Sequence, residues 1–343
     1  MVLNEDIRGM NGPGTIRVAY FLSTRELADN EPLSDTDSAA NEAHRGNLPR
    51  LKEMLDVYNR HVAEGSASGP RIEVVAIVCD DDHPRRDFSD LGILMHQEPS
   101  SSFARLRRGD GESQEAFRNR KATAKAEYEH RLLGVMHQHG ADLVISDRYM
   151  RLFGPTFLSE YLGLVLNSHP AILPDNPGAT PTANALARSR EQGYSWTGNT
   201  LHIIDHGEDT GPAVMQGERT PVLPGDTTAA LRARNYRNEA PNIYAGLLSY
   251  ASDPSVRQLI RLRRQLPSAN GQRGRIMDAM ESLRQNILDN YRATFGRFYE
   301  DRNTMEPGRY SYCARLMMRG IARQGAEAIP RQPMRAPAAR ASW

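Results

Sequence analysis

The chain has 343 residues, of which 39% are apolar and 25% charged, and its formal net charge is +1. This balance is compatible with a soluble globular protein that has a proper core. No stretch approaches the roughly 18 consecutive apolar residues that span a bilayer, and the opening MVLNEDIRGMNGPG is too acidic to predict a secretory signal. With Cys79 and Cys313 as the only cysteines, we expect no disulfide framework, no cysteine-rich metal site and a cytoplasmic location.

Charge is spread unevenly along the chain. From residue 255 onward there are seventeen Arg, no Lys and seven acidic residues, so this part carries about +10 and the preceding part about −9. Such a pattern is typical of solvated helix faces with a basic end, and the alternative is a surface for anions or nucleic acid. Because no nucleic-acid-binding motif or aromatic interleaving accompanies the arginines, we expect no nucleic-acid partner.

Strand and helix patterns alternate from the N-terminal part onward. Thr15 to Leu22 is predicted to be a strand, and polar residues from Ser23 to Glu42 form a long connection. Apolar residues at helical spacing predict a helix over Asn47 to Glu64. Ile72 to Val78 is almost continuously apolar, as parallel strands are when helices cover both faces of a sheet. We expect residues 80 to 120 to be a charged, irregular and exposed excursion.

The alternation continues toward the middle of the chain. A helix is predicted over Ala122 to His139, a strand over Asp142 to Ser146, and a helix over Phe157 to Leu162 that leads into a strand over Leu164 to Leu166. Strands that alternate with helices predict an α/β domain with a mostly parallel sheet. In such sheets ligands bind at the carboxyl ends of the strands.

The strand patterns stop beyond Asp253, where VRQLIRLRRQL and residues 274–301 are amphipathic helical sequences. Their apolar stripe indicates packing on the core or on another subunit, and it consists of Ile276, Met277, Met280, Leu283, Ile287 and Tyr291. We therefore predict a flexible N-terminus over 1–14, a catalytic domain over 15–252, a helical extension over 253–330 and a disordered tail over 331–343.

Two polar side chains follow the strand Leu164 to Leu166. Asn167 and His169 open the segment NSHPAILPDNPG, which contains three prolines. Because alternate residues of a strand face the same side, Asn167 and His169 would face one reactant together. In isolation such a pair is more often a turn-capping arrangement, so the rest of the chain has to supply further catalytic groups.

A second segment, TGNTLHIIDHGEDTGPAVMQGERTPVLPGDT, supplies a carboxylate. A strand over Thr200 to Ile204 runs into a turn in which Asp209 precedes Thr-Gly-Pro. Asn, His and Asp together suggest a division of labour. The amide donates to an oxygen that becomes negative, the imidazole moves a proton, and the carboxylate sets the charge of the imidazole.

Other polar groups have plainer interpretations. His202 and His206, with Asp205 between them, have a spacing that does not converge on a metal at a strand-to-loop junction, so no metal is expected. The acidic run Asp80 to Asp82 is interpreted as a solvated strand exit, and Cys79 as a small buried residue.

The segments NSHPAILPDNPG, DTGPAVMQ and PVLPGDT, in this order, resemble the folate-dependent formyltransferases, in particular phosphoribosylglycinamide formyltransferase. The likeness extends back through ADLVISDRYMRLFGPTFLSEYLG and forward to about Tyr250. It implies a Rossmann-like formyltransferase domain that transfers a formyl group from 10-formyltetrahydrofolate to an amine, with Asn167, His169 and Asp209 as the catalytic trio. It also implies folate contacts at Met150, Arg151, Leu152, Asp205, His206, Gly207 and Glu208.

The sequence departs from this family on the acceptor side. In phosphoribosylglycinamide formyltransferase the first strand leads directly into a glycine-rich loop that cradles the substrate phosphate. Here about twenty polar residues follow Leu22, and Gly46-Asn47-Leu48 is similar only to the end of that loop. We therefore expect a small-molecule amine or hydroxylamine acceptor from specialised metabolism, such as siderophore synthesis, nearer to the hydroxyornithine type than to amino sugars.

Three other functions stay open at this stage. The chain could formylate phosphoribosylglycinamide in purine synthesis, or it could be a formyltetrahydrofolate deformylase in which water replaces the amine. A more distant alternative is a non-catalytic binding protein whose arginine-rich tail holds a partner. The sequence does not identify the acceptor, and the additional C-terminal helices are compatible with a homodimer.

Overall fold

The computed structural model describes residues 14–24, 46–84, 88–193, 195–269 and 271–302. The predicted N-terminal segment up to residue 13, most of the connection after the first strand and the tail over 331–343 lie outside these ranges. Among the residues that the structure describes, every helix falls short of the length and apolar character needed to cross a bilayer.

A seven-stranded sheet forms the centre of the described part of the chain, in the order β3-β2-β1-β4-β5-β7-β8. The pairs from β3 to β5 are parallel, whereas β7 and β8 join antiparallel. The strands are β1 (Ile16–Leu22), β2 (Ile72–Cys79), β3 (Met95–Gln97), β4 (Leu143–Asp147), β5 (Val165–His169), β7 (Thr200–Ile203) and β8 (Ala213–Gln216). A separate ribbon pairs β6 (Trp196–Thr197) with β9 (Thr220–Pro221).

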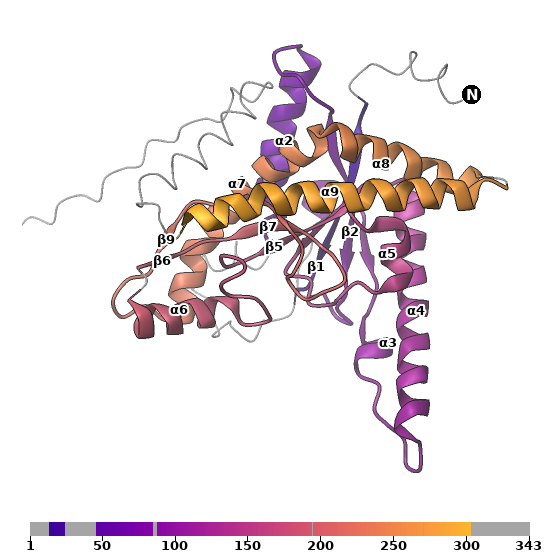
Figure 1. Ribbon diagram of the computed structural model, residues 1–343, viewed down its shortest axis with the longest axis horizontal. Coiled ribbons are helices and arrows are strands. Elements are labelled where there is room, and N and C mark those ends of the chain that lie inside the picture. The colour runs from indigo at the N-terminus through magenta and orange to yellow at the C-terminus, as the bar shows by residue number, and fades with distance from the viewer. Residues whose placement is uncertain (1–13, 25–45, 85–87, 194, 270, 303–343) are drawn as a thin grey trace, which may run out of the picture.

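Helices cover both faces of this sheet (Figure 1). α2 (Leu48–Ala63) packs with α7 (Thr228–Ser252) on one face, and α4 (Gln114–His139) packs with α5 (Pro155–Tyr161) on the other. Shorter elements are η2 (Ser89–Leu91), α3 (Ser101–Ala104), α6 (Pro181–Gln192) and η3 (Leu266–Ser268). The strands are buried between these layers because β1 and β2 are nearly all apolar and β4 begins with Leu-Val-Ile. The predicted α/β, Rossmann-like fold with a mostly parallel sheet is confirmed.

The order of the strands places a ligand site between β1 and β4. The chain builds outward from β1 through β2 to β3, and then returns to the other side of β1 with β4. At this reversal Leu22 at the end of β1 lies beside Asp147 at the end of β4. Loops leave in opposite directions from such a point, so a crevice forms outside the carboxyl ends of the strands.

Two further helices, α8 (Pro254–Gln265) and α9 (Arg273–Arg302), follow α7, and α9 lies across the front of the molecule in Figure 1. The predicted helical C-terminal region is therefore confirmed as far as residue 302. The apolar sides of both helices belong to the same core as the sheet, through Val256, Leu259, Met280 and Ile287. The division at residue 253 stays a prediction, because the two helices complete the core of the preceding domain.

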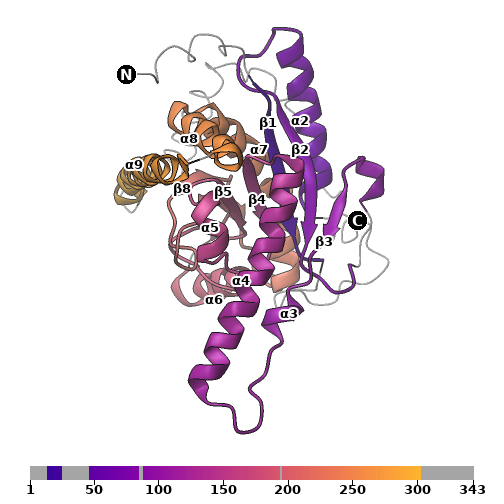
Figure 2. The same cartoon turned by 90° about the vertical axis from the view of Figure 1, so that its right-hand side faces the viewer.

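The structure corrects the expected excursion over residues 80–120. Met95–Gln97 is a strand that extends the sheet, and α4 begins at Gln114 instead of Ala122. The N-cap is Ser113, whose Oγ accepts a hydrogen bond from the Ala116 amide at 3.1 Å. The first turns of α4 project beside α3, away from the sheet (Figure 2). They bury no apolar stripe, so hydrophobic periodicity did not predict them.

Candidate active site

β5 carries two of the predicted catalytic residues and runs further than the sequence indicated. The strand continues through His169 instead of ending at Leu166, because β7 pairs antiparallel along its free side. This pairing places His202 of β7 directly beside Asn167, while Ser146 of β4 lies on the other side of Asn167. Three adjacent strands thus present polar side chains at one edge of the sheet.

The ring of His169 lies between two acceptors. Its Nδ1 is 3.4 Å from Oδ2 of Asp209, and its Nε2 is 2.7 Å from the carbonyl oxygen of Asn176. A carbonyl oxygen only accepts, so Nε2 carries the proton when the ring is neutral. A second proton would bind Nδ1 and be shared with Asp209. The structure therefore brings the predicted His169 and Asp209 together at the distance of an ion pair.

The amide of Asn167 is held in one orientation. Ser146 Oγ donates to Asn167 Oδ1 at 2.9 Å, and Asn167 Nδ2 lies 3.0 Å from Nε2 of His202. The other nitrogen of His202, Nδ1, lies 3.2 Å from the carbonyl oxygen of Ile203, so it carries the ring proton and Nε2 accepts from Asn167. An amide nitrogen has two hydrogens, and this contact uses only one of them.

His202 was considered in the sequence only as a metal ligand, and its place in the site was missed. It is buried, and its Nε2 is 3.5 Å from Oδ1 of Asp209, so it links Asp209 to Asn167. The register of β5 against β7 creates this contact, and a sequence pattern does not reveal which strands pair. In the described ranges, no group of three or more His, Cys, Asp or Glu is arranged to hold a metal ion.

The loop that carries Asp209 is tightly folded. Asp209 has a left-handed backbone with φ of 54°, which costs about 1–2 kcal/mol for a residue with a side chain. The amide of Gly178 donates to Asp209 Oδ2 at 2.8 Å and helps to hold this conformation. Within the Thr-Gly-Pro turn, a Cβ at Gly211 would lie 1.7 Å from the carbonyl oxygen of Ile203, so only glycine fits there.

Burial and charge set the protonation of the two acid–base groups. Burial lowers the pKa of His169 below its ordinary value of 6.5, although the Asp209 carboxylate and the Asn176 carbonyl act in the opposite sense. Burial alone would raise the pKa of Asp209, but its contact with His202, the positive charge that His169 can carry and the Gly178 amide together keep it below its ordinary value. At pH 7 Asp209 is therefore ionised and His169 neutral.

All predicted site residues line one pocket of about 190 Å³ at the carboxyl edge of the sheet. Met150 and Leu152 expose 39% and 62% of their surfaces, which is unusual for large apolar residues and suits an apolar ring of a ligand. The lining includes the trio Asn167, His169 and Asp209 and the predicted folate contacts Met150, Arg151, Leu152, Asp205, His206, Gly207 and Glu208.

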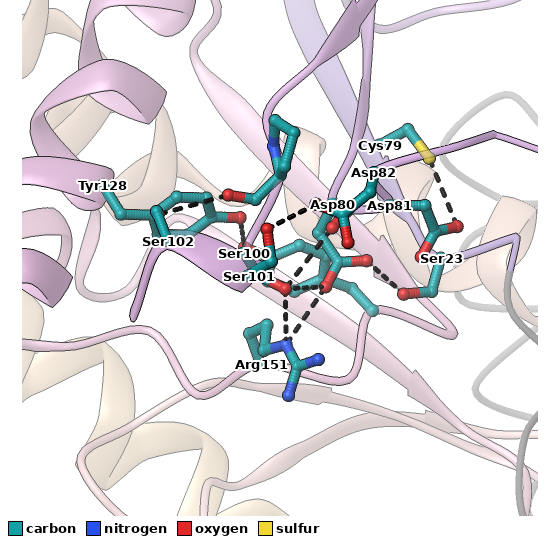
Figure 3. A network of polar contacts seen from close by, with 12 residues as sticks. Ser23, Cys79, Asp80, Asp81, Asp82, Ser100, Ser101, Ser102, Tyr128 and Arg151 are labelled. Atoms are coloured by element: carbon teal, nitrogen blue, oxygen red, sulfur yellow. Dashed lines mark hydrogen bonds and ion pairs between the residues drawn. The ribbon is translucent and has the colours of Figure 1, made fainter. Parts of the chain in front are cut away.

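The side chain of Arg151, which lines the pocket, is anchored to the protein through its Nε. Its Nε lies 3.1 Å from Oδ2 of Asp80 and 2.9 Å from Oγ of Ser100 (Figure 3). Ser23 donates to the other oxygen of Asp80, so this buried carboxylate ties the Met150–Leu152 turn to β1 and α3. The predicted solvated run Asp80 to Asp82 is corrected accordingly, since Asp80 and Asp81 are buried.

The side chain of Asp205 is also committed to the protein. Its Oδ1 accepts from the Gly207 amide at 3.0 Å and from Thr210 Oγ1 at 2.6 Å, which closes the turn before Asp209. Its Oδ2 lies 3.0 Å from Nη2 of Arg292 on α9. A ligand would therefore contact the backbone and the neighbouring exposed residues of this loop. The side chain of Asp205 holds the loop in its conformation.

The fold brings Asn167, His169 and Asp209 together at the carboxyl edge of its parallel strands, which defines an α/β domain with a ligand site at this edge. The chain belongs to the formyl transferase family, whose model matches residues 60–247. Members of this family use 10-formyltetrahydrofolate as the formyl donor.

Curated relatives include phosphoribosylglycinamide formyltransferases. The protein from Mycobacterium tuberculosis (strain CDC 1551 / Oshkosh) is 42% identical over 114 residues, which are 33% of this chain and 51% of that protein. The protein from Escherichia coli (strain K12) is 32% identical over 138 residues, or 40% of this chain and 60% of that protein. The chain thus spans about half to three fifths of the length of these relatives.

Similar solved structures carry the same kind of name. Phosphoribosylglycinamide formyltransferase from Streptococcus pneumoniae TIGR4 is 25% identical with a TM-score of 0.43, over 68% of this chain and 97% of that chain. PvdF of pyoverdin biosynthesis, described as a structurally unique N10-formyltetrahydrofolate-dependent formyltransferase, is 22% identical with a TM-score of 0.49, over 69% and 100%.

Proposed function

We propose that this protein transfers a formyl group from 10-formyltetrahydrofolate to the amino or hydroxylamino group of a small molecule. The observation that carries the proposal is the grouping of the buried His169 with the half-buried Asn167 and Asp209 around one pocket, with Asn167 oriented by His202. Family membership supplies the donor. The exposed apolar surfaces of Met150 and Leu152 and the folded Asp205–Asp209 loop are the groups that would hold it.

The chemistry of the residues suits acyl transfer. The bound donor would supply the formyl group. As the amine attacks, the carbonyl oxygen becomes negative, and the free hydrogen of the Asn167 amide is placed to donate to it. One such donor is worth about 2.7–4 kcal/mol in comparable sites. His169, neutral at rest, takes the proton that the amine loses, and the carboxylate of Asp209 stabilises the resulting imidazolium.

A specialised acceptor, of which hydroxyornithine is the type, is favoured over a sugar phosphate by the beginning of α2. The backbone amide of Asn47 at this helix N-terminus donates to Oδ2 of Asp147 at 2.9 Å, and the Asn47 side chain reaches the same oxygen at 3.2 Å. A helix N-terminus is where a phosphate would be held. Here the Asp147 carboxylate accepts the hydrogen bond from that backbone amide, and its negative charge would repel a phosphate. The curated relatives argue for the alternative, phosphoribosylglycinamide.

The replacement His169→Ala tests the proposed mechanism. We expect turnover to fall by about 10²–10⁴, the usual contribution of a positioned acid–base group, while a 10-formyl folate analogue still binds. His130→Ala, an exposed substitution on α4, is the matched control. Turnover close to that of the unaltered protein would contradict the role of His169.

A further inference from the structure

A second group of charged side chains lines the same pocket beyond the trio. Asp147 and Glu239 are 1% and 2% exposed, and Arg148 and Arg232 line the pocket with them. Carboxylates buried to this degree are rare in proteins without a cation or several donors around them.

The amide of Asn47 bridges the two carboxylates. Its Nδ2 lies 2.8 Å from Oε2 of Glu239 and 3.2 Å from Oδ2 of Asp147, and Tyr20 donates to the same Asp147 oxygen at 2.5 Å. Each carboxylate therefore has one oxygen satisfied by the protein. The other two oxygens, Asp147 Oδ1 and Glu239 Oε1, are buried with no hydrogen-bond partner in the part of the chain that the structure describes.

Two acceptors of this kind call for a donor with positive charge. A buried acceptor without a partner costs about 1–3 kcal/mol, and more when it is charged. Burial, followed by the charge of Asp147, raises the pKa of Glu239 to about 7 against the opposing charges of Arg232 and Arg148, so Glu239 is about half protonated near neutral pH. A cationic ligand between them would replace that proton.

Positive charge lies in the same part of the pocket, on Arg148 and Arg232. Arg148 and Arg232 lie 5.7 Å and 5.0 Å from the centre of the Tyr236 ring, and Arg232 Nη2 donates to the Tyr236 hydroxyl at 2.9 Å. Arg148, which directly follows β4, has a left-handed backbone with φ of 61° and lines the pocket. Guanidinium groups are suited to a carboxylate. The region therefore offers both signs of charge.

We propose that Asp147 and Glu239 bind a protonated amino group of the acceptor that is distinct from the nitrogen that receives the formyl group. The acceptor is thus a diamino compound, and the adjacent arginines make a diamino acid its chemical class. The assignment rests on the proposed function only in calling this ligand the acceptor. A phosphate ester is disfavoured at the same place, because both carboxylates and the occupied amide of Asn47 face it.

Binding without the folate donor tests the inference directly. Titration calorimetry of the full chain would compare L-ornithine with 5-aminovaleric acid, which lacks only the α-amino group, and with 1,4-diaminobutane, which lacks the carboxylate. We expect ornithine to bind at least tenfold more tightly than 5-aminovaleric acid. We also expect binding at pH 7 to release part of a proton from Glu239, seen as a dependence of the measured heat on the ionisation enthalpy of the buffer.

Variants separate recognition from folding. Glu239→Gln keeps the shape of the side chain. It should lower the affinity for ornithine at least tenfold and abolish proton release, while the affinity for a folate analogue stays unchanged. Asp147→Asn gives an independent second test, and Glu53→Gln, exposed on α2, is the control. Three results would each overturn the inference. They are equal affinities for ornithine and 5-aminovaleric acid, no binding of ornithine at millimolar concentration, and tighter binding of phosphoribosylglycinamide than of ornithine.

The proposed function and this inference fail differently. Ornithine binding that depends on Glu239, without formyl transfer to any amine, would support the recognition site and contradict the formyltransferase activity. Efficient formyl transfer to monoamines that lack a second amino group would support the activity and overturn the diamino acid.

Discussion

At the scale of single residues, the site depends on how neighbouring strands hold each other's side chains. Asn167 is fixed between Ser146 and His202, and His169 between Asn176 and Asp209. Each functional group thus has a partner that decides which end of it faces the pocket. His202 serves two of them, since it contacts both Asn167 and Asp209.

Replacing His202 with Ala should lower kcat more than it alters binding of the folate donor. Without Nε2 of His202 as its hydrogen-bond acceptor, the Asn167 amide can rotate. Its NH2 group then faces the oxygen that becomes negative for only part of the time. We expect a decrease of kcat by about tenfold to a hundredfold, smaller than the 10²–10³ found when such a donor is removed outright. Steady-state kinetics against His130→Ala would measure it, and an unchanged kcat would show that Asn167 needs no support.

The lowered pKa of His169 predicts a specific dependence of stability on pH. Because the folded state holds His169 deprotonated more strongly than the unfolded chain does, the unfolded state binds more protons below pH 6.5. The free energy of unfolding should therefore fall as the pH drops through 6.5 toward the lower folded pKa. In His169→Gln this contribution should vanish, so denaturant titrations between pH 7 and pH 5 should give a flatter profile. An identical slope in both proteins would contradict the assignment.

At the scale of elements, α9 is connected to the site through one ion pair. Arg292 on α9 contacts Asp205, and Asp205 closes the turn that precedes Asp209. The same loop also lines the pocket. The long C-terminal helix therefore supports the geometry of the loop as well as covering the core.

Arg292→Ala tests this connection. The Arg292 side chain is 46% exposed, so loss of the pair should change the free energy of unfolding by less than about 1 kcal/mol. The KM for the folate donor should rise several-fold because the loop becomes less ordered. Arg275→Ala, exposed on the same helix, is the matched control. A KM equal to that of the control would show that α9 only covers the core.

At the scale of the whole molecule, the family domain and the C-terminal helices share one core. Val256, Leu259 and Ile260 of α8 and Met280, Ile287 and Leu288 of α9 are buried in the same cluster as β1 and β4. Arg264 of α8 also holds Asp142 with contacts of 2.7 Å and 2.6 Å, and the side chain of Asp142 is fully buried.

Truncation after residue 253 should therefore prevent folding of the preceding domain. The truncation removes six large buried side chains, each of which contributes about 1.5–3 kcal/mol by its burial. The summed loss is most or all of the usual free energy of unfolding of about 5–15 kcal/mol. Truncation after residue 330 serves as the control, and we expect it to cost little stability. Circular dichroism and thermal unfolding would distinguish the two, and a stable, cooperative fold without α8 and α9 would contradict a shared core.

Much of this architecture could be predicted from the sequence because β1, β2, α2 and the C-terminal helices carry clear apolar periods. The place of Asn167, His169 and Asp209 followed from strand ends and turns. His202 and the Asp147–Glu239 pair could not be found in this way. Their roles arise from the β5–β7 register and from contacts across about a hundred residues or more, as between Asn47 and Glu239. The first turns of α4 were missed because they bury no apolar stripe.

The most direct test of the central claim is release of the deformylated folate from a 10-formyl folate analogue, followed by absorbance with the purified full chain. The panel would contain hydroxyornithine, ornithine, phosphoribosylglycinamide, several amino sugars and a control without acceptor. We predict release that requires an acceptor and is fastest with the hydroxyornithine or ornithine type. Release at the same rate without any acceptor, as a deformylase would give, or no release with any member of the panel, would contradict the proposed function.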